Sequence, residues 1–173
     1  MRDVNDCNNV RFIMKKNHIL ILTLLAFSLF VNAQQFRMKT PEFVLENDSA
    51  KPMAGTVQMM TQRLRADLEQ RADIELVDEG GQGAKCQCVV KNIQVLKNVY
   101  TGSEYKAWHT RVTAIVQVQL EINGRSVTRK FSITRRLRST SGEPQLDAAV
   151  FKEMASDIVN QCYGELVDIV ECN

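Results

Sequence analysis

The chain has 173 residues, of which 45% are hydrophobic and 24% are charged. This length predicts about one domain. Its 22 lysines and arginines stand against 20 aspartates and glutamates, and this balance excludes the strongly basic composition that identifies many nucleic-acid-binding proteins.

The N-terminal part carries the features of an export signal in their usual order. Met14 and two lysines, Lys15 and Lys16, precede an apolar run over residues 19–31, and the residues at its end fit a cleavage site between Ala33 and Gln34. We therefore expect residues 14–33 to be a signal peptide, and residues 1–13 to be an extension upstream of the true start. A membrane span takes about 20 apolar residues, so this run is short for one. An uncleaved N-terminal anchor is the alternative to a periplasmic or secreted protein.

Residues 34–50 are predicted to be an N-terminal segment, followed by a single domain over residues 51–173. Phe43–Leu45 is expected to form a strand at the edge of the sheet. Pro41 lies just before it, and the backbone N–H that proline lacks is not needed at an edge. The Asn-Asp-Ser sequence at residues 47–49 is typical of a helix cap. In the amphipathic helix that follows, apolar residues recur at spacings of three and four: Met53, Val57, Met60, Leu64 and Leu68.

The clearest pattern extends from Ala84 to Arg136 and predicts three successive antiparallel strands. Between Trp108 and Ile122 apolar residues alternate with polar ones, which indicates a strand with one buried and one solvated face. Asn123-Gly124 then predicts a tight hairpin, since both central residues of a type I′ turn need a positive φ. The returning strand is expected to place three apolar residues inward: Val127, Phe131 and Ile133.

Shorter signals complete the element order. Ile74–Val77 is typical of a short strand, and Gly80–Gly83 lies in a flexible loop. The first strand of the meander needs a β-bulge near Lys91 or Asn92 to bring its apolar residues to one face. A last helix begins near residues 144–147, with this apolar stripe: Val150, Phe151, Met154, Ile158, Cys162, Leu166 and Ile169.

Four cysteines follow the predicted signal peptide, and an oxidising compartment favours disulfides between them. Cys86 and Cys88 are too poorly oriented to pair with each other on one strand. Cys162 and Cys172 are about 15 Å apart in a continuous helix, at 1.5 Å per residue. We therefore expect two bridges that join the strand to the helix, with either register open.

The one concentration of basic residues lies on the last strand of the meander and just after it: Arg125, Arg129, Lys130, Arg135, Arg136 and Arg138. One interpretation is a solvated strand whose charges protect the sheet edge. The other is a binding patch for an envelope polymer, lipid head groups or an acidic protein. Nucleic acid is not expected, because of the export signal and because the only aromatic residue among these, Phe131, is predicted to point inward.

Motifs for catalysis are not found: there is no nucleophile elbow, zinc-protease helix, phosphate-binding loop or dinucleotide fingerprint. No enzyme, cofactor or metal is therefore expected. The alternative is a metal-binding or thiol-dependent protein that uses Cys86, Cys88 and His109, because these residues and a third cysteine are a possible zinc set.

The order of elements resembles a periplasmic α/β domain. A helix such as MMTQRLRADLEQ leads to a strand such as IELVD, then to AKCQCVVKNIQVL, to the alternating VTAIVQVQLEI with its NGR turn, and to a final helix, LDAAVFKEMASDIVNQCYGEL. This pattern, over roughly Lys51 to Val170, is similar to the curli-secretion lipoprotein, the LpoB-type activators of penicillin-binding proteins and the N-terminal domain of TolB. The resemblance implies an envelope assembly or protein-binding module and transfers no site residue. The chain departs from this group in having no cysteine for lipidation.

We therefore predict an α+β fold, with two helices on one face of a mostly antiparallel sheet of four or five strands. The expected function is an exported, non-enzymatic interaction module of the cell envelope. It would bind a protein or polymer through the open sheet face, the Gly80–Gly83 loop or the basic strand. A self-assembling structural domain is a further alternative.

Overall fold

The computed structural model describes residues 35–172, except for residues 103 and 105. Its elements, in chain order, are β1 (Phe36–Lys39), β2 (Glu42–Leu45), the 3-10 helix η1 (Asp48–Thr56), α2 (Val57–Glu69), β3 (Ile74–Val77), β4 (Lys85–Thr101), β5 (Lys106–Ile122), β6 (Arg125–Ser139) and α3 (Ala148–Glu171). The predicted signal peptide (14–33) and upstream extension (1–13) lie outside the described residues.

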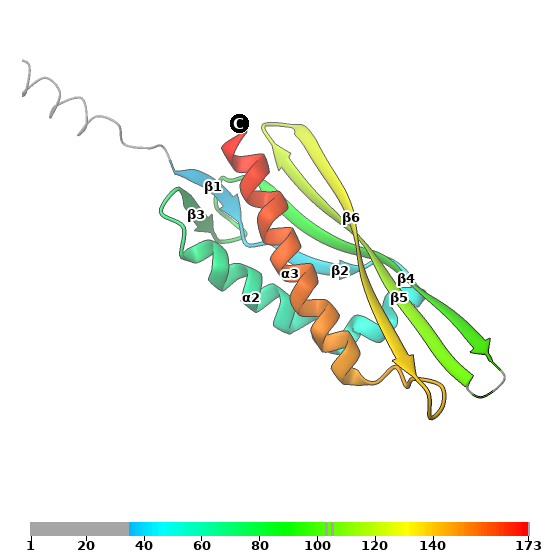
Figure 1. The fold of residues 1–173 in the computed structure, drawn as a ribbon. Helices are drawn as coiled ribbons and strands as arrows, with labels where there is room; N and C mark the ends of the chain where they lie inside the picture. Colours follow the sequence, from blue (N-terminus) through cyan, green and yellow to red (C-terminus); the bar gives the residue numbers. More distant parts are fainter. Residues whose placement is uncertain (1–34, 103, 105, 173) are drawn as a thin grey trace, which may run out of the picture. The chain divides into compact units, whose positions relative to one another are not determined.

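The strands form two sheets. β4, β5 and β6 make the predicted antiparallel meander, and β2 pairs with β4 in parallel to give a four-stranded sheet of order β2-β4-β5-β6 (Figure 1). β1 and β3 form a separate two-stranded parallel sheet. The α+β class and the mostly antiparallel sheet are confirmed. β1 was missed, because its sequence FRMK is only four residues long and has a single fully buried residue, Met38, beside the partly buried Phe36.

Alternation along β5 sets which side chains enter the core. Val112, Val116 and Leu120 are fully buried on the face that packs against the helices, which we call the inner face. Successive residues of a strand point to opposite sides, so Arg111, Thr113 and the other odd-numbered residues of β5 point to the opposite, outer face. Three apolar residues of β6 pack partly buried against the same core, as expected: Val127, Phe131 and Ile133.

The predicted Asn-Gly turn joins β5 to β6. Asn123 and Gly124 have φ values of 49° and 77°, and Ile122 pairs with Arg125 on either side of them. Both central residues therefore adopt the left-handed conformation of a type I′ turn. This turn fixes the register of β6 against β5 through to Ser139.

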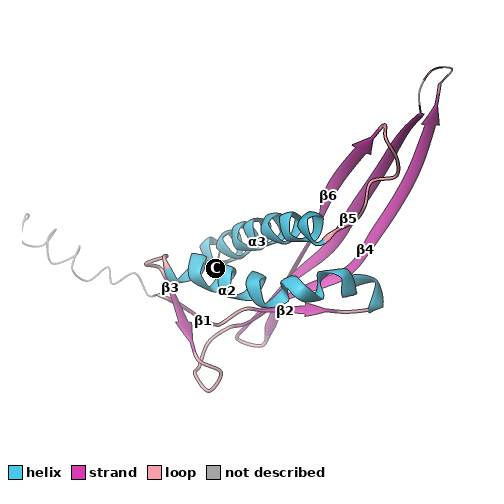
Figure 2. Cartoon of the chain, turned by 90° about the horizontal axis from the view of Figure 1, so that it is seen from below, coloured by secondary structure: helices cyan, strands magenta, loops and turns pink. Residues whose placement is uncertain are grey.

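The helices pack on the sheet, and η1 and α3 begin at side-chain caps, whereas α2 follows η1 directly without one. Asn47 accepts a hydrogen bond from the Ser49 N–H at the start of η1. Asp147 accepts from the Ala149 and Val150 N–H groups at the start of α3, at 3.0 and 3.1 Å. Figure 2 shows α2 and α3 on the same side of the long strands. The predicted apolar stripes are confirmed, because these helix residues are fully buried: Met60, Leu64, Leu68, Met154, Ile158, Cys162 and Leu166.

Two features of β4 shape its far half. The register shifts between Val90 and Asn92, which confirms the predicted bulge. β4 then continues to Thr101, and β5 begins at Lys106. The far ends of β4, β5 and β6 run past the start of α3, and neither helix covers them (Figures 1 and 2). We call this uncovered part the distal end of the sheet.

Candidate functional site

The register of the hairpin determines which cross-strand pairs lie closest together. Residues that flank a two-residue turn, here Ile122 and Arg125, form a hydrogen-bonded pair. Hydrogen-bonded and non-hydrogen-bonded pairs alternate along an antiparallel ladder, and the second kind has Cα atoms only about 4.5 Å apart. The odd-numbered residues of β5 therefore form the closer pairs with β6. The Oγ1 atoms of Thr113 and Thr134 confirm this closeness, at 3.0 Å.

Two such close pairs at the distal end bring four basic side chains together on the outer face. Arg111 pairs with Arg136, and His109 pairs with Arg138. We call these four residues the cationic cluster. The three arginines are exposed, and His109 is half-buried. Like charges directly opposite each other destabilise a sheet, so the Arg111–Arg136 pair has an energetic cost in the isolated protein.

Little on this face compensates the charge. None of the three arginines has an ion pair with any residue that the structure describes. Among the outward-facing described residues of β4, β5 and β6, the only acidic one is Glu121, which lies close to the turn. The distance from Glu121 to Arg111 along β5 is about 30 Å, at roughly 3.3 Å per residue. The outer face at the distal end is therefore positively charged.

The cationic cluster lines a shallow cavity of about 370 Å³. Asn98 and Tyr100 of β4 add polar and aromatic groups to its wall. The Tyr100 ring lies edge-on to the His109 ring, with centroids 4.8 Å apart. This contact fixes the imidazole on the outer face, beside Arg111 and Arg138. The cavity therefore offers guanidinium groups, which can bind carboxylates and phosphates through bidentate hydrogen bonds.

The predicted basic patch is divided between the two faces of β6. Lys130, Arg136 and Arg138 point outward with the cluster. Arg125, Arg129 and Arg135 share the parity of the core residues Phe131 and Ile133 and point inward, because side chains alternate along a strand.

The inward-pointing arginines differ in their surroundings. Arg135 lies against α3, where it bonds Asp157 at 2.6 Å and reaches Glu153 at 3.9 Å. Arg125 and Arg129 are exposed. Arg135 therefore joins the sheet to the helix, and Arg111 and His109 take its place among the outward-facing basic groups.

The cysteines lie in the core rather than at the cationic cluster. Cys86, Cys88 and Cys162 are buried and Cys172 is exposed, and all four are free thiols. The Cys86 thiol is hydrogen-bonded to Cys88, and Cys88 to Cys162. These hydrogen bonds and burial raise the pKa of the Cys86 and Cys88 thiols well above the usual value. The structure thus brings Cys88 of the strand to Cys162 of the helix, but it contains neither expected bridge. Cys172 has no sulfur partner among the described residues.

The proposed zinc set of Cys86, Cys88 and His109 is not brought together. Cys88 pairs with Val118 and His109 with Asn98, so the two lie about 30 Å apart along the sheet, at roughly 3.3 Å per residue. They also point to opposite faces, because position 109 is odd and Val118 is buried on the inner face. In the part of the chain that the structure describes, no three His, Cys, Asp or Glu residues are grouped for a metal.

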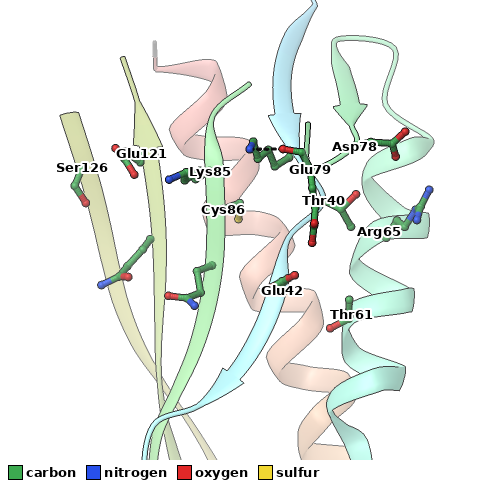
Figure 3. A pocket seen from close by; sticks show the side chains of 13 residues that line it. Thr40, Glu42, Thr61, Arg65, Asp78, Glu79, Lys85, Cys86, Glu121 and Ser126 are labelled. Carbon is green, nitrogen blue, oxygen red and sulfur yellow. Dashed lines mark hydrogen bonds between the residues drawn. The ribbon is translucent and has the colours of Figure 1, made fainter. Parts of the chain in front are cut away.

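A second, larger cavity of about 600 Å³ lies at the opposite end, between the outer sheet face, α2 and the loop after β3 (Figure 3). Asp78 and Glu79, which directly precede the Gly80–Gly83 loop, line it. Its charges are mixed: Lys85 pairs across the strands with Glu121, and Lys39 donates to the Glu79 carbonyl oxygen at 2.6 Å. This cavity therefore favours neither anions nor cations, unlike the cationic cluster.

No known protein family model matches the sequence, and no curated protein matches it significantly. The chain is similar to several solved structures, among them a minor lipoprotein from Acinetobacter baumannii (13% identity, TM-score 0.42, 75% of this chain and 93% of that one). A neuraminyllactose-binding hemagglutinin homolog from Helicobacter pylori has 13% identity and a TM-score of 0.45, over 81% of this chain and 82% of that one. Lipoprotein GNA1162 from Neisseria meningitidis has 12% identity and a TM-score of 0.31, over 73% of this chain and 96% of that one.

Similarity of this size assigns no function. None of the helices in the described part of the chain is long and apolar enough to span a membrane.

Proposed function

We propose that the protein is a non-enzymatic binding module of the cell envelope, which holds an anionic partner on the outer face of its sheet. The observation that carries this proposal is the Arg111–Arg136 pair: two exposed guanidinium groups on directly opposite residues, with no acidic residue near them among the described residues of β4, β5 and β6. A carboxylate or phosphate between them would remove the repulsion and gain two charge-assisted contacts.

The arrangement favours an extended anion over a single ion. The Arg111–Arg136 row and the His109–Arg138 row are two residues apart on each strand, which is about 7 Å at 3.4 Å per residue. Lys130 continues the positive charge along the same face of β6. A chain of carboxylates or phosphates would contact successive rows, and its binding would weaken as salt rises, because exposed charges are screened over about 10 Å at 0.1 M.

Binding of fluorescent poly-glutamate at low and high salt tests the proposal. The variant R111S/R136S is expected to lose most of the affinity. The matched control is R125S/R129S, which removes the same net charge from inward-pointing, exposed positions of the same sheet. Equal losses in both variants would mean that overall charge alone attracts the polymer, and the proposal would be wrong.

Location outside the cytoplasm is part of this proposal and is supported by the signal-like residues 14–33. The expected mature protein begins at Gln34. The mass and N-terminal sequence of the protein recovered from an exported fraction test it. A protein that keeps residues 14–33 and stays in the cytoplasm would contradict an envelope role and leave the anion-binding face unaffected.

A further inference from the structure

β4 has a long edge that carries no partner strand in the described structure. β2 pairs with β4 only over Gln87–Val90, whereas β4 continues to Thr101. From Lys91 onward β4 is bonded to β5 on one side only. This stretch, which we call the free edge, is about 35 Å long at roughly 3.3 Å per residue. Figure 1 shows its far part at the end of the sheet, beyond the helices.

The register shows which backbone groups of the free edge point away from the sheet. Even-numbered residues of β5 bond to β6, so the odd-numbered ones bond to β4. Leu96 and Asn98 pair with the odd-numbered Arg111 and His109, and their backbone groups face β5. The N–H and C=O groups of Val95, Lys97 and Val99 therefore face outward. The Val90 carbonyl before the bulge is consistent with this pattern, because it accepts from the Glu46 N–H on the same side.

The free edge has few of the features that protect sheet edges from association. It contains no proline, and its large apolar side chains are exposed on both faces: Val95 by 38%, Leu96 by 55%, Val99 by 44% and Tyr100 by 55%. Its one distal charge, Lys97, is paired with Glu143. The opposite edge, β6, carries five arginines and a lysine, which is the usual protection. The two edges of the sheet are therefore not equivalent.

We propose that the free edge binds an extended, acidic segment of the protein partner as an added β-strand, an inference that rests on the anion-binding function proposed above. The backbone groups of Val95, Lys97 and Val99 supply the ladder. Residues of the segment that point to the inner side contact Val95 and Val99. Residues that point to the outer side lie next to Leu96 and Asn98, in the rows of the cationic cluster.

Charge complementarity identifies this occupant. The row through Leu96 continues to Arg111 and then to Arg136, and the row through Asn98 continues to His109 and Arg138. An outward residue of the added strand is two strand spacings from Arg111, or about 10 Å. A glutamate and an arginine that extend toward each other across Leu96 close that distance. In a segment that alternates acidic and apolar residues, the acidic ones therefore face the cationic cluster and the apolar ones face Val95 and Val99.

The test uses the full chain and a labelled octapeptide of alternating glutamate and valine, with binding measured by fluorescence anisotropy. The wild-type protein is expected to bind it. Val99→Pro removes one outward N–H while the β4–β5 hydrogen bonds stay, because proline is tolerated where the N–H faces away from the sheet. The expected loss is about tenfold, the effect of one hydrogen bond of ordinary strength. Val99→Thr keeps the N–H and serves as the matched control.

A second measurement does not depend on the folding of a variant. The same octapeptide, N-methylated at every residue, keeps its charges and has no backbone N–H on either edge to donate to the ladder, so it is expected to lose binding to the wild-type protein. Equal binding of both peptides, or no loss in Val99→Pro, would overturn strand addition while loss in R111S/R136S would still support the anion-binding face. Conversely, unchanged binding in R111S/R136S would overturn the acidic partner and the proposed function together.

A second copy of the chain is the competing occupant of the free edge. The mass in solution of the wild-type protein and of Val99→Pro, measured by sedimentation, distinguishes these two occupants. A monomeric wild-type protein that binds the octapeptide supports the proposal. A wild-type dimer that Val99→Pro converts to a monomer would mean that β4 pairs with itself, and the proposal would be wrong.

Discussion

Arg111 and Arg136 are directly opposite each other on the outer face of the sheet, in a close non-hydrogen-bonded pair of β5 and β6. Two residues further along, the Thr113 and Thr134 hydroxyls meet at 3.0 Å in an equivalent pair. Placing two like charges where the ladder brings side chains closest has a cost in stability. The pair therefore links two properties that are usually independent, the affinity for an anion and the stability of the free protein.

Arg136→Thr is expected to make the free protein more stable and a weaker anion binder. Removing one of two like charges in a directly opposed pair stabilises a sheet by about 0.2–1 kcal/mol, and threonine suits a strand. Urea unfolding at low salt measures the gain, which is expected to shrink at 1 M salt, where screening acts over about 3 Å.

Lys130→Thr is the control for this substitution, since it removes the same charge from the same face and strand, opposite the uncharged Gln117. Its effect on stability is expected to be smaller. If Arg136→Thr proved less stable than the wild-type protein, the repulsion that we assign to the pair would be absent.

Replacing Arg135, the residue before Arg136, is expected to have the opposite effect on stability. Arg135 points to the inner face and bonds Asp157 of α3 at 2.6 Å, so Arg135→Ala is expected to destabilise the protein by roughly 1 kcal/mol. A double-mutant cycle with Asp157→Ala measures the pairing itself, with an expected coupling of about 0.2–1 kcal/mol because both side chains are partly exposed. A coupling of zero would show that Arg135 acts by packing alone.

Much of the cationic cluster was predictable from the sequence. The Asn123-Gly124 turn fixes Ile122 opposite Arg125, and counting back along both strands places Arg111 opposite Arg136. Alternation then separates Arg135 from Arg136 by face. The basic residues were instead grouped by their closeness in the chain, which hid the contribution of β5 to the cluster.

Other features depend on packing that no local pattern encodes. β1 and β3 are four residues each, and their parallel pairing joins residues 38 positions apart in the sequence, Phe36 and Ile74. The free edge exists because β2 is much shorter than β4, a difference between two distant segments. The contact of Cys88 with Cys162 likewise requires the rotation of α3 on the sheet, which its apolar stripe defines only approximately.

The Gly124 backbone provides a test of the turn that sets this register. Gly124→Ala is expected to destabilise the protein by about 1–2 kcal/mol, because its φ of +77° is unfavourable for any residue with a Cβ. No atom lies within 4 Å of the added methyl group, so the cost is conformational rather than steric. Gly80→Ala has the same open space without a positive φ, and little loss is expected there. Urea unfolding of both variants is the measurement, and equal effects would contradict a type I′ turn.

The buried thiols predict that stability falls in alkaline solution. Hydrogen bonding and burial raise the pKa of Cys86 and Cys88 in the folded protein, whereas an unfolded cysteine ionises with a pKa of about 8.5. The unfolded chain therefore releases protons that the folded chain keeps, and the stabilisation present below pH 8.5 is lost as pH rises above it. The expected slope is up to about 1.4 kcal/mol per pH unit for each of these thiols.

Unfolding in urea between pH 8 and 9.5 measures this slope, under reducing conditions and below the range in which lysines titrate. Cys172→Ser is the matched control: its thiol is exposed in the fold, so the slope is expected to persist. Brief alkylation of the native protein followed by peptide mapping is an independent check, with Cys172 modified and Cys86, Cys88 and Cys162 modified only after unfolding. Rapid native modification of Cys88 would contradict its burial, and recovery of Cys88 linked to Cys162 from oxidised protein would establish the strand-to-helix bridge that the sequence predicted.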